Sequence, residues 1–230
     1  MPTLLWNEIE TVLLDMDGTL LDLHYDNQFW LHHLPRKLAE KDNISLEQAE
    51  KFLMGEYQRV MGTLHWYCLD WWAEKLDMDI VQAKREIDHL ISMRPDTIPF
   101  LDALRDTGRE VYLVTNAHPD SLSLKIEKTA LDTHIKVLYS THQFGVTKES
   151  LSLWQQLQEE IKFDKQKTLF VDDSLPILAK AGEFGIKHLL AVANPDSQKP
   201  VREIDEYPSV IDYRDITPDI FAEPISRRAN

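Results

Sequence analysis

Short apolar runs that stop at polar residues recur along the chain and predict its strands. Runs of this kind occupy residues 11–14, 111–114, 135–139, 168–171 and 187–192. Stretches of four to six apolar and β-branched residues are typical of buried strands. Helix-period patterns lie between the later runs, for example over residues 121–130 and 148–161. Strands that alternate with helices predict an α/β fold, in which a parallel sheet is covered on both faces.

The interval 21–94 departs from this alternation, because it contains helical stretches and no strand-like run. Ser45 with Gln48, and Asp79 with Gln82, have the spacing of a helix-starting capping box. The run Arg94-Pro95-Asp96-Thr97-Ile98-Pro99 marks a return to the core, since proline disfavours helix in the residue before it. We predict a core from residues 1–20 and 95–225 and an inserted α-helical domain from 21–94, with a short edge strand at 209–211.

Composition and charge narrow the classes of function. A chain of 230 residues with 43% hydrophobic residues can bury a sizeable core. The net charge of −14 and the lack of a basic block argue against binding to polymeric nucleic acid. No apolar run approaches the roughly 20 residues needed to span a bilayer, and the start has no signal-peptide pattern. We therefore expect no membrane association and a cytoplasmic location.

Cysteine and histidine give no metal signature in the sequence. The single cysteine, Cys68, has no thiol partner for a disulfide or a zinc cluster, so we expect a buried small hydrophobe. The nine histidines show no His-x-x-x-His or comparable spacing. Redox chemistry and zinc binding are therefore not expected from the sequence.

Two carboxylates follow the first predicted strand. Asp15 and Asp17 stand two residues apart, and Gly18 allows a tight turn beside a ligand. One carboxylate can attack phosphorus while the other protonates the leaving oxygen and later activates water. A calcium loop of the EF-hand type would need glycine and glutamate where Leu20 and Asp26 stand, so this alternative fails on spacing.

Two more acids follow the strand predicted at 168–171. Asp172 and Asp173, together with Asp15, could hold one hard divalent cation through oxygen ligands, and Mg²⁺ suits a site that also receives phosphate. Alone, adjacent acids at a strand end are more often solvated turn residues or helix caps. We assign Asp172 and Asp173 to a metal site only because the chain also carries the motif with Asp15 and Asp17.

Phosphate-binding groups are predicted at two further strand ends. Thr115 and Asn116 offer a hydroxyl, an amide and backbone N–H groups ahead of a helix expected after Pro119. Lys148 opens the helical pattern after the next strand, where its ammonium group could neutralise the same phosphoryl group. An ordinary exposed lysine is an equally good interpretation of Lys148 in isolation.

The chain order of these residues resembles the haloacid dehalogenase (HAD) superfamily. That resemblance implies a Rossmann-like core with a helical cap inserted after the first motif, and a Mg²⁺ cofactor. It also implies roles for the site residues: Asp15 as nucleophile and metal ligand, Asp17 as general acid/base and metal ligand, Thr115 and Asn116 as phosphate binders, Lys148 as charge clamp, and Asp172 and Asp173 as metal ligands.

Asp17 favours a phosphatase, because the superfamily's dehalogenases lack an aspartate at this position. The chain departs from the family pattern at two places. Lys148 lacks the frequent Gly-Lys-Pro setting, and no acid stands four residues after Asp173. The predicted metal site therefore depends on Asp172 as a ligand.

The inserted domain carries an unusually aromatic stretch, Thr63-Leu64-His65-Trp66-Tyr67-Cys68-Leu69-Asp70-Trp71-Trp72. As one helix it would place Leu64, Cys68 and Trp71 on one face and Trp66 nearly opposite. One face would then pack the domain while the other meets a ligand. The competing interpretation makes all of these aromatic residues core.

With this stretch and Thr115-Asn116-Ala117-His118-Pro119, the chain is similar to bacterial GMP/IMP nucleotidases of the superfamily. The similarity implies hydrolysis of purine nucleoside 5′-monophosphates through an aspartyl-phosphate, and a flat purine would stack well in an aromatic cap. We expect the base to meet Asn27, Trp30, Trp66, Tyr67 and His118. The alternatives are a phosphatase or phosphomutase for a sugar phosphate or phosphoglycolate, and a non-catalytic relative that binds phosphorylated ligands.

Overall fold

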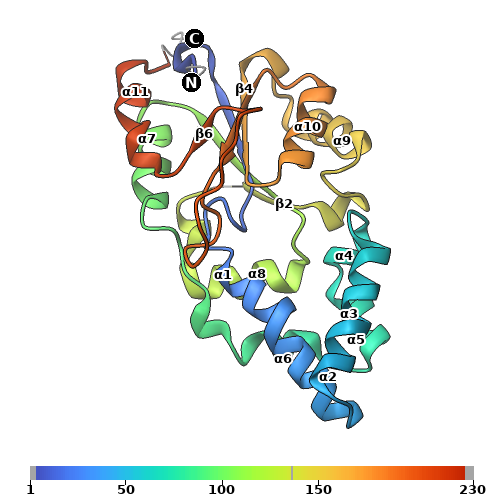
Figure 1. Ribbon diagram of the computed structural model, residues 1–230. Helices are drawn as coiled ribbons and strands as arrows, with labels where there is room; N and C mark the ends of the chain where they lie inside the picture. Colours follow the sequence, from blue (N-terminus) through green and yellow to red (C-terminus); the bar gives the residue numbers. More distant parts are fainter. Residues whose placement is uncertain (1–3, 136, 226–230) are drawn as a thin grey trace.

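The computed structural model describes residues 4–135 and 137–225, and it is built on one parallel six-stranded sheet (Figure 1). The strands are β1 (Thr11–Leu14), β2 (Glu110–Thr115), β3 (Val137–Ser140), β4 (Thr168–Asp172), β5 (His188–Val192) and β6 (Ser209–Val210). Their order across the sheet is β3-β2-β1-β4-β5-β6. All five predicted core strands and the short edge strand are confirmed; Lys136, inside the stretch predicted for β3, lies outside the described residues.

Helices cover the sheet and build the inserted region. The core helices are α7 (Thr97–Asp106), α8 (Pro119–Thr129), α9 (Leu151–Ile161), α10 (Leu175–Phe184) and α11 (Thr217–Ala222). The inserted region holds α1 (His24–Gln28), a π-helical turn η2 (Phe29–His33), α2 (Leu34–Asp42), α3 (Leu46–Val60), α4 (Leu64–Tyr67), α5 (Leu69–Leu76) and α6 (Ile80–Arg85). Short 3₁₀ turns are η1 (Trp6–Glu8), η3 (Asp88–Leu90), η4 (Leu131–Thr133), η5 (Thr141–Phe144), η6 (Lys165–Lys167) and η7 (Tyr213–Asp215).

The sheet divides its side chains between two apolar layers. In β1, Val12 and Leu14 pack into the layer that contains Phe100 of α7, whereas Leu13 packs into the layer that contains Trp154 of α9. This two-residue alternation is what a strand requires when both of its faces are covered. Strand β1 is therefore fully buried. Polar side chains can follow in the sequence only where the strand ends.

The inserted helices have an apolar core of their own, which includes Phe29, Leu53 and Trp72. Figure 1 shows α2 to α6, in blue to teal, gathered beside the α/β core. The connections to and from this cap lie together, because Leu21 forms an antiparallel bridge with Met93. We retain 21–94 as the proposed extent of the cap. The capping box predicted at Ser45 is present with both of its hydrogen bonds.

Two local predictions were wrong. The aromatic stretch is not one helix, because it breaks at Cys68, whose backbone is extended between α4 and α5. The indole N–H of Trp72 donates to the Trp66 carbonyl at 3.0 Å, so a side chain satisfies an acceptor at the break. Cys68 is also half-buried rather than buried. Within the described residues, no helix is long and apolar enough to cross a membrane.

Candidate active site

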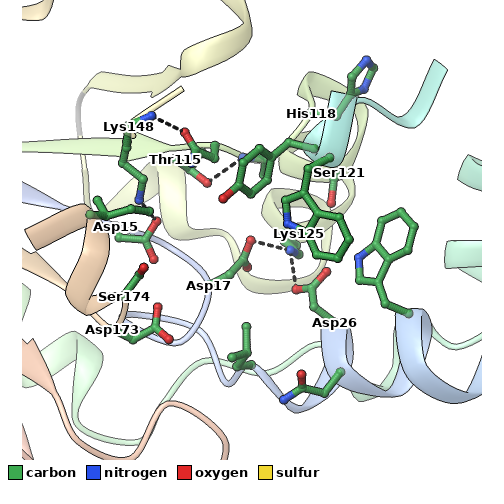
Figure 2. Close-up of a pocket in the computed structure, with 18 of the residues that line it drawn as sticks. Asp15, Asp17, Asp26, Thr115, His118, Ser121, Lys125, Lys148, Asp173 and Ser174 are labelled. Carbon is green, nitrogen blue, oxygen red and sulfur yellow. Dashed lines mark hydrogen bonds and ion pairs between the residues drawn. The ribbon is translucent and has the colours of Figure 1, made fainter. Parts of the chain in front are cut away.

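The predicted chemical residues meet where the parallel strands end. Asp15 follows β1 directly, and its backbone N–H donates to the Val171 carbonyl on β4 at 3.0 Å. Thr115 ends β2 and Asp172 ends β4, the two strands that flank β1. Because parallel strands bring their carboxyl ends to one edge, residues distant in sequence converge there. Figure 2 shows Asp15, Thr115, Lys148 and Asp173 around one cavity.

Lys148 ties two buried acids together. Its Nζ donates to Asp15 Oδ1 at 2.5 Å and to Asp172 Oδ2 at 2.7 Å, and all three residues are buried. Lys148 lies three residues before α9 rather than in it, because Ser150 caps the helix by accepting from the Ser152 N–H. The exposed-lysine alternative is therefore wrong.

The acidic cluster fits a hard divalent cation. One carboxylate oxygen from each of Asp15, Asp172 and Asp173 lies within 4.8 Å of the others. Burial raises the pKa of Asp15 to about 6 despite Lys148, and burial together with the charges of Asp172 and Asp15 raises that of Asp173 well above its usual range. Asp15 and Asp172 are buried and Asp173 is half-buried, and one ammonium group does not neutralise these three carboxylates, so an oxygen-only site for Mg²⁺ matches this donor set.

Gly18 allows the loop after β1 to pass close to the acidic cluster. Its φ of +87° lies in the left-handed region, and its N–H donates to the Leu21 carbonyl at 2.8 Å. A Cβ at this position would stand 2.8 Å from Asp173 Cγ and 3.0 Å from Pro195 Cβ. Glycine is therefore required both by the backbone and by the packing against Asp173.

Asp17 belongs to a second, mixed-charge cluster that we did not foresee. Lys125 on α8 contacts Asp17 Oδ2 and Asp26 Oδ2, each at 2.7 Å (Figure 2). Lys84 on α6 contacts Asp26 Oδ1 at 3.0 Å. Burial raises the pKa of Asp17 to about 6, against the charge of Lys125. Burial also acts to raise the pKa of Asp26, but its two ammonium partners outweigh it and lower the value to about 2. The ion pair between Lys125 and Asp26 thus joins core and cap beside Asp17.

The amide of Asn116 is committed to protein contacts. Its Oδ1 accepts from the Thr141 hydroxyl and the Lys148 backbone N–H, both at 3.0 Å. Its Nδ2 donates to Glu149 at 3.0 Å, and Glu149 also accepts from the Tyr67 hydroxyl at 2.7 Å. The Asn116 side chain therefore fixes the loop that carries Lys148, and Glu149 is a further residue that sequence reasoning missed. A phosphate-binding role for Asn116 rests on its backbone N–H.

A cavity of about 330 Å³ lies between the cap and the strand ends, near the lower limit for small-molecule sites. All five residues expected to meet a base line it: Asn27, Trp30, Trp66, Tyr67 and His118. The rings of Trp30 and Trp66 stack with centroids 6.1 Å apart. Asn27 donates to Asp196 at 2.7 Å. The structure thus brings the five residues predicted to meet the base to the cavity that holds Asp15.

Comparisons with known proteins agree with this arrangement. The GMP/IMP nucleotidase YrfG of Escherichia coli is 44% identical over 215 residues, covering 94% of this chain and 97% of that protein. A HAD phosphatase from Thermococcus onnurineus has the same fold, with a TM-score of 0.77 at 22% identity, covering 94% of this chain and all of that chain. The L-2-haloacid dehalogenase from Xanthobacter autotrophicus has a TM-score of 0.63 at 17% identity, covering 91% and 97%.

The family itself is shown by a match over most of the chain. The model for haloacid dehalogenase-like hydrolases matches residues 9–183, a segment that runs from before β1 into the last turn of α10 and so includes the cap and the ends of β1, β2, β3 and β4. The chain therefore belongs to the haloacid dehalogenase-like hydrolases.

Proposed function

We propose that this chain hydrolyses purine nucleoside 5′-monophosphates, GMP and IMP, to nucleoside and phosphate. The observation that carries the proposal is the placement of Asp15 and Asp17 at the floor of a cavity whose other wall is aromatic. The chain is a phosphoric monoester hydrolase of the haloacid dehalogenase type, and the 44% identity to a GMP/IMP nucleotidase supports the choice of substrate.

The chemistry uses the two aspartates in turn. An Asp15 carboxylate oxygen attacks phosphorus, and the bond from phosphorus to the 5′-oxygen breaks as that oxygen takes a proton from Asp17. Water then gives a proton to Asp17 and attacks the aspartyl-phosphate, which restores Asp15 and releases phosphate. Asp17 Oδ1 is buried without a hydrogen-bond partner among the described residues, so one oxygen is free to carry that proton.

The other site residues stabilise charge on the phosphoryl group. Lys148 and the backbone N–H of Asn116 face its oxygens in this proposal, and the Thr115 hydroxyl, which accepts from the Ala117 N–H at 3.0 Å, donates to them. Asp15, Asp172 and Asp173 would hold Mg²⁺, which supplies positive charge beside the same oxygens.

Phosphate release across a substrate panel tests the proposal. We expect kcat/KM to be highest for GMP and IMP and lower for sugar phosphates and phosphoglycolate, with turnover lost when EDTA removes Mg²⁺. A higher kcat/KM for a sugar phosphate or phosphoglycolate would contradict the proposed substrate but would leave the proposed phosphatase mechanism intact. A chain that binds GMP but releases no phosphate with Mg²⁺ would be the non-catalytic relative.

Replacing Trp66 by alanine separates stacking from packing. Trp66 lines the cavity, and the loss of one stacking partner is worth about 1 kcal/mol, so Trp66→Ala should raise KM for GMP about fivefold. KM for glycerol phosphate, which has no ring, should change little. The matched control is Trp71→Ala, because Trp71 stacks on His65 and is not a cavity residue. Equal rises of KM for both substrates would assign Trp66 to packing alone.

A further inference from the structure

Three metal-ligating side chains meet outside the acidic cluster, and one of them, His118, also lines the cavity. They are Cys68 between α4 and α5, His118 at the start of α8, and His142 in η5. One ligand atom from each lies within 4.8 Å of the others. We propose that Cys68, His118 and His142 form a binding site for Zn²⁺, or a similar borderline-soft divalent cation, that joins the cap to the core.

His142 is already arranged as a metal ligand. Its Nε2 is buried and has no hydrogen-bond partner among the described residues. The backbone of Asn116 lies near the same ring and acts to raise its pKa. A buried ring nitrogen without a hydrogen-bond partner can be presented to a metal. Burial, followed by the proximity of His118, lowers the pKa of His142, which favours the neutral ring that a metal needs.

His118 has acidic groups near both of its nitrogens. Nδ1 accepts a hydrogen bond from the Asp120 backbone N–H at 3.3 Å and lies 3.6 Å from Asp120 Oδ2, and Nε2 lies 3.5 Å from Asp70 Oδ2. A metal on Nε2 would move the ring proton to Nδ1, so the hydrogen bond from the Asp120 N–H would be lost and the Asp120 carboxylate would accept the proton instead. The fourth ligand of a tetrahedral set would be a water molecule, or the exposed Asp70 after its side chain turns from His118 toward the ion.

The geometry needs only a small adjustment. Bonds from Zn²⁺ to sulfur or nitrogen are about 2.0–2.3 Å long, so ligand atoms up to 4.8 Å apart must approach by roughly 1 Å. The rings of His118 and His142 are 5.0 Å apart and nearly perpendicular, at 80°, so neither ring blocks the other. A thiolate and two imidazoles prefer Zn²⁺ to Mg²⁺, whereas the cluster around Asp15 is oxygen-only. The two sites therefore select different ions.

An ion at this site would bridge two domains. Cys68 and Asp70 belong to the cap, and His118 and His142 belong to the core. Substrate entry and product release in capped enzymes require movement of the cap, so a bound Zn²⁺ would hold the cap closed and slow turnover. This consequence rests on the proposed phosphatase activity, whereas the binding of the ion does not.

Cobalt(II) titration of the full chain in excess Mg²⁺ tests the binding. Thiolate-bound Co²⁺ gives a charge-transfer absorption in the near ultraviolet, and the chain has one cysteine, so this band reports Cys68 alone. We expect one Co²⁺ per chain, displacement by Zn²⁺, no band in Cys68→Ser, and affinity at least about tenfold weaker in His142→Asn. The absence of a band in the wild-type chain, or equal affinity in His142→Asn, would overturn the site.

Zinc inhibition of phosphate release tests the bridge. Without Zn²⁺, Cys68→Ser should equal the wild type, which also shows that the variant folds. In excess Mg²⁺, the variant should need at least about tenfold more Zn²⁺ for half-inhibition. Zinc that displaces Mg²⁺ from the acidic cluster would inhibit both proteins equally, and that outcome would overturn the closure of the cap. A chain without phosphatase activity would still give the cobalt result, so the two failures can be distinguished.

Discussion

Asp15→Asn should abolish turnover, with phosphate release from GMP falling by at least about 10⁴-fold. The amide has almost the same volume as the carboxylate but cannot attack phosphorus as an anion. Lys148 retains Asp172 as a partner at 2.7 Å, so the fold should persist. Because burial raises the pKa of Asp15 to about 6, a neutral side chain relieves a desolvated charge, and the thermal midpoint should stay the same or rise.

The measurement combines initial rates, thermal unfolding and the intact mass of the protein after rapid quenching. Wild-type protein should show a phosphoryl adduct that Asp15→Asn lacks. Asp132→Asn is the matched control, because Asp132 is an exposed aspartate in η4 and is not a cavity residue. Undiminished turnover in Asp15→Asn would rule out Asp15 as nucleophile, and a lower thermal midpoint would show that the carboxylate also supports the fold.

Lys148→Met should damage both activity and stability. It removes the charge proposed to face the phosphoryl group, an effect of about 10²–10³-fold on kcat. It also leaves Asp15 and Asp172 buried without their shared cation, a loss on the order of 3 kcal/mol, or roughly 10 °C in thermal midpoint. Mg²⁺ should then restore more stability to this variant than to the wild type, because the acidic cluster becomes more negative.

Thermal unfolding with and without Mg²⁺ checks this result, and Lys84→Met is its control. Lys84 is also a buried lysine paired with an aspartate, but its partner is Asp26 and not the acidic cluster. Its loss should lower the thermal midpoint while the stabilisation by Mg²⁺ stays as in the wild type. An equal response to Mg²⁺ in all three proteins would show that the cation does not compete with Lys148 for the cluster.

The sequence predicted the parts of the site that local pattern controls. Asp15 directly follows one fully buried parallel strand and Asp172 ends another, and such strands show as apolar runs that stop abruptly at an acid. Once a parallel sheet is predicted, the ends of its strands must share one edge. The convergence of Asp15, Thr115 and Asp172 therefore followed from short stretches of sequence.

Other contacts carry no local signal. Lys125 on the core helix α8 meets Asp26 only through the docking of the cap, and Lys84 on α6 meets it through the packing of helices within the cap. Each looks like an ordinary charged residue of an amphipathic helix, a class that is mostly exposed. The break at Cys68 depends on a hydrogen bond from Trp72, which a helical periodicity does not reveal. The contacts of Lys125 and Lys84 and the helix break at Cys68 therefore depend on tertiary packing, which the local sequence does not show.

The shared position of Asp26 has a consequence for exchanging caps between relatives. Its carboxylate balances Lys84 of the cap and Lys125 of the core, and Lys84 also lies 4.4 Å from the centre of the Phe29 ring. A chimera that receives a foreign cap without an acid at this position would leave Lys125 with Asp17 alone. Whether a transplanted cap is compatible with the core therefore depends on one carboxylate at the junction. A graft that carries Asp26 and Lys84 together should keep the recipient core functional.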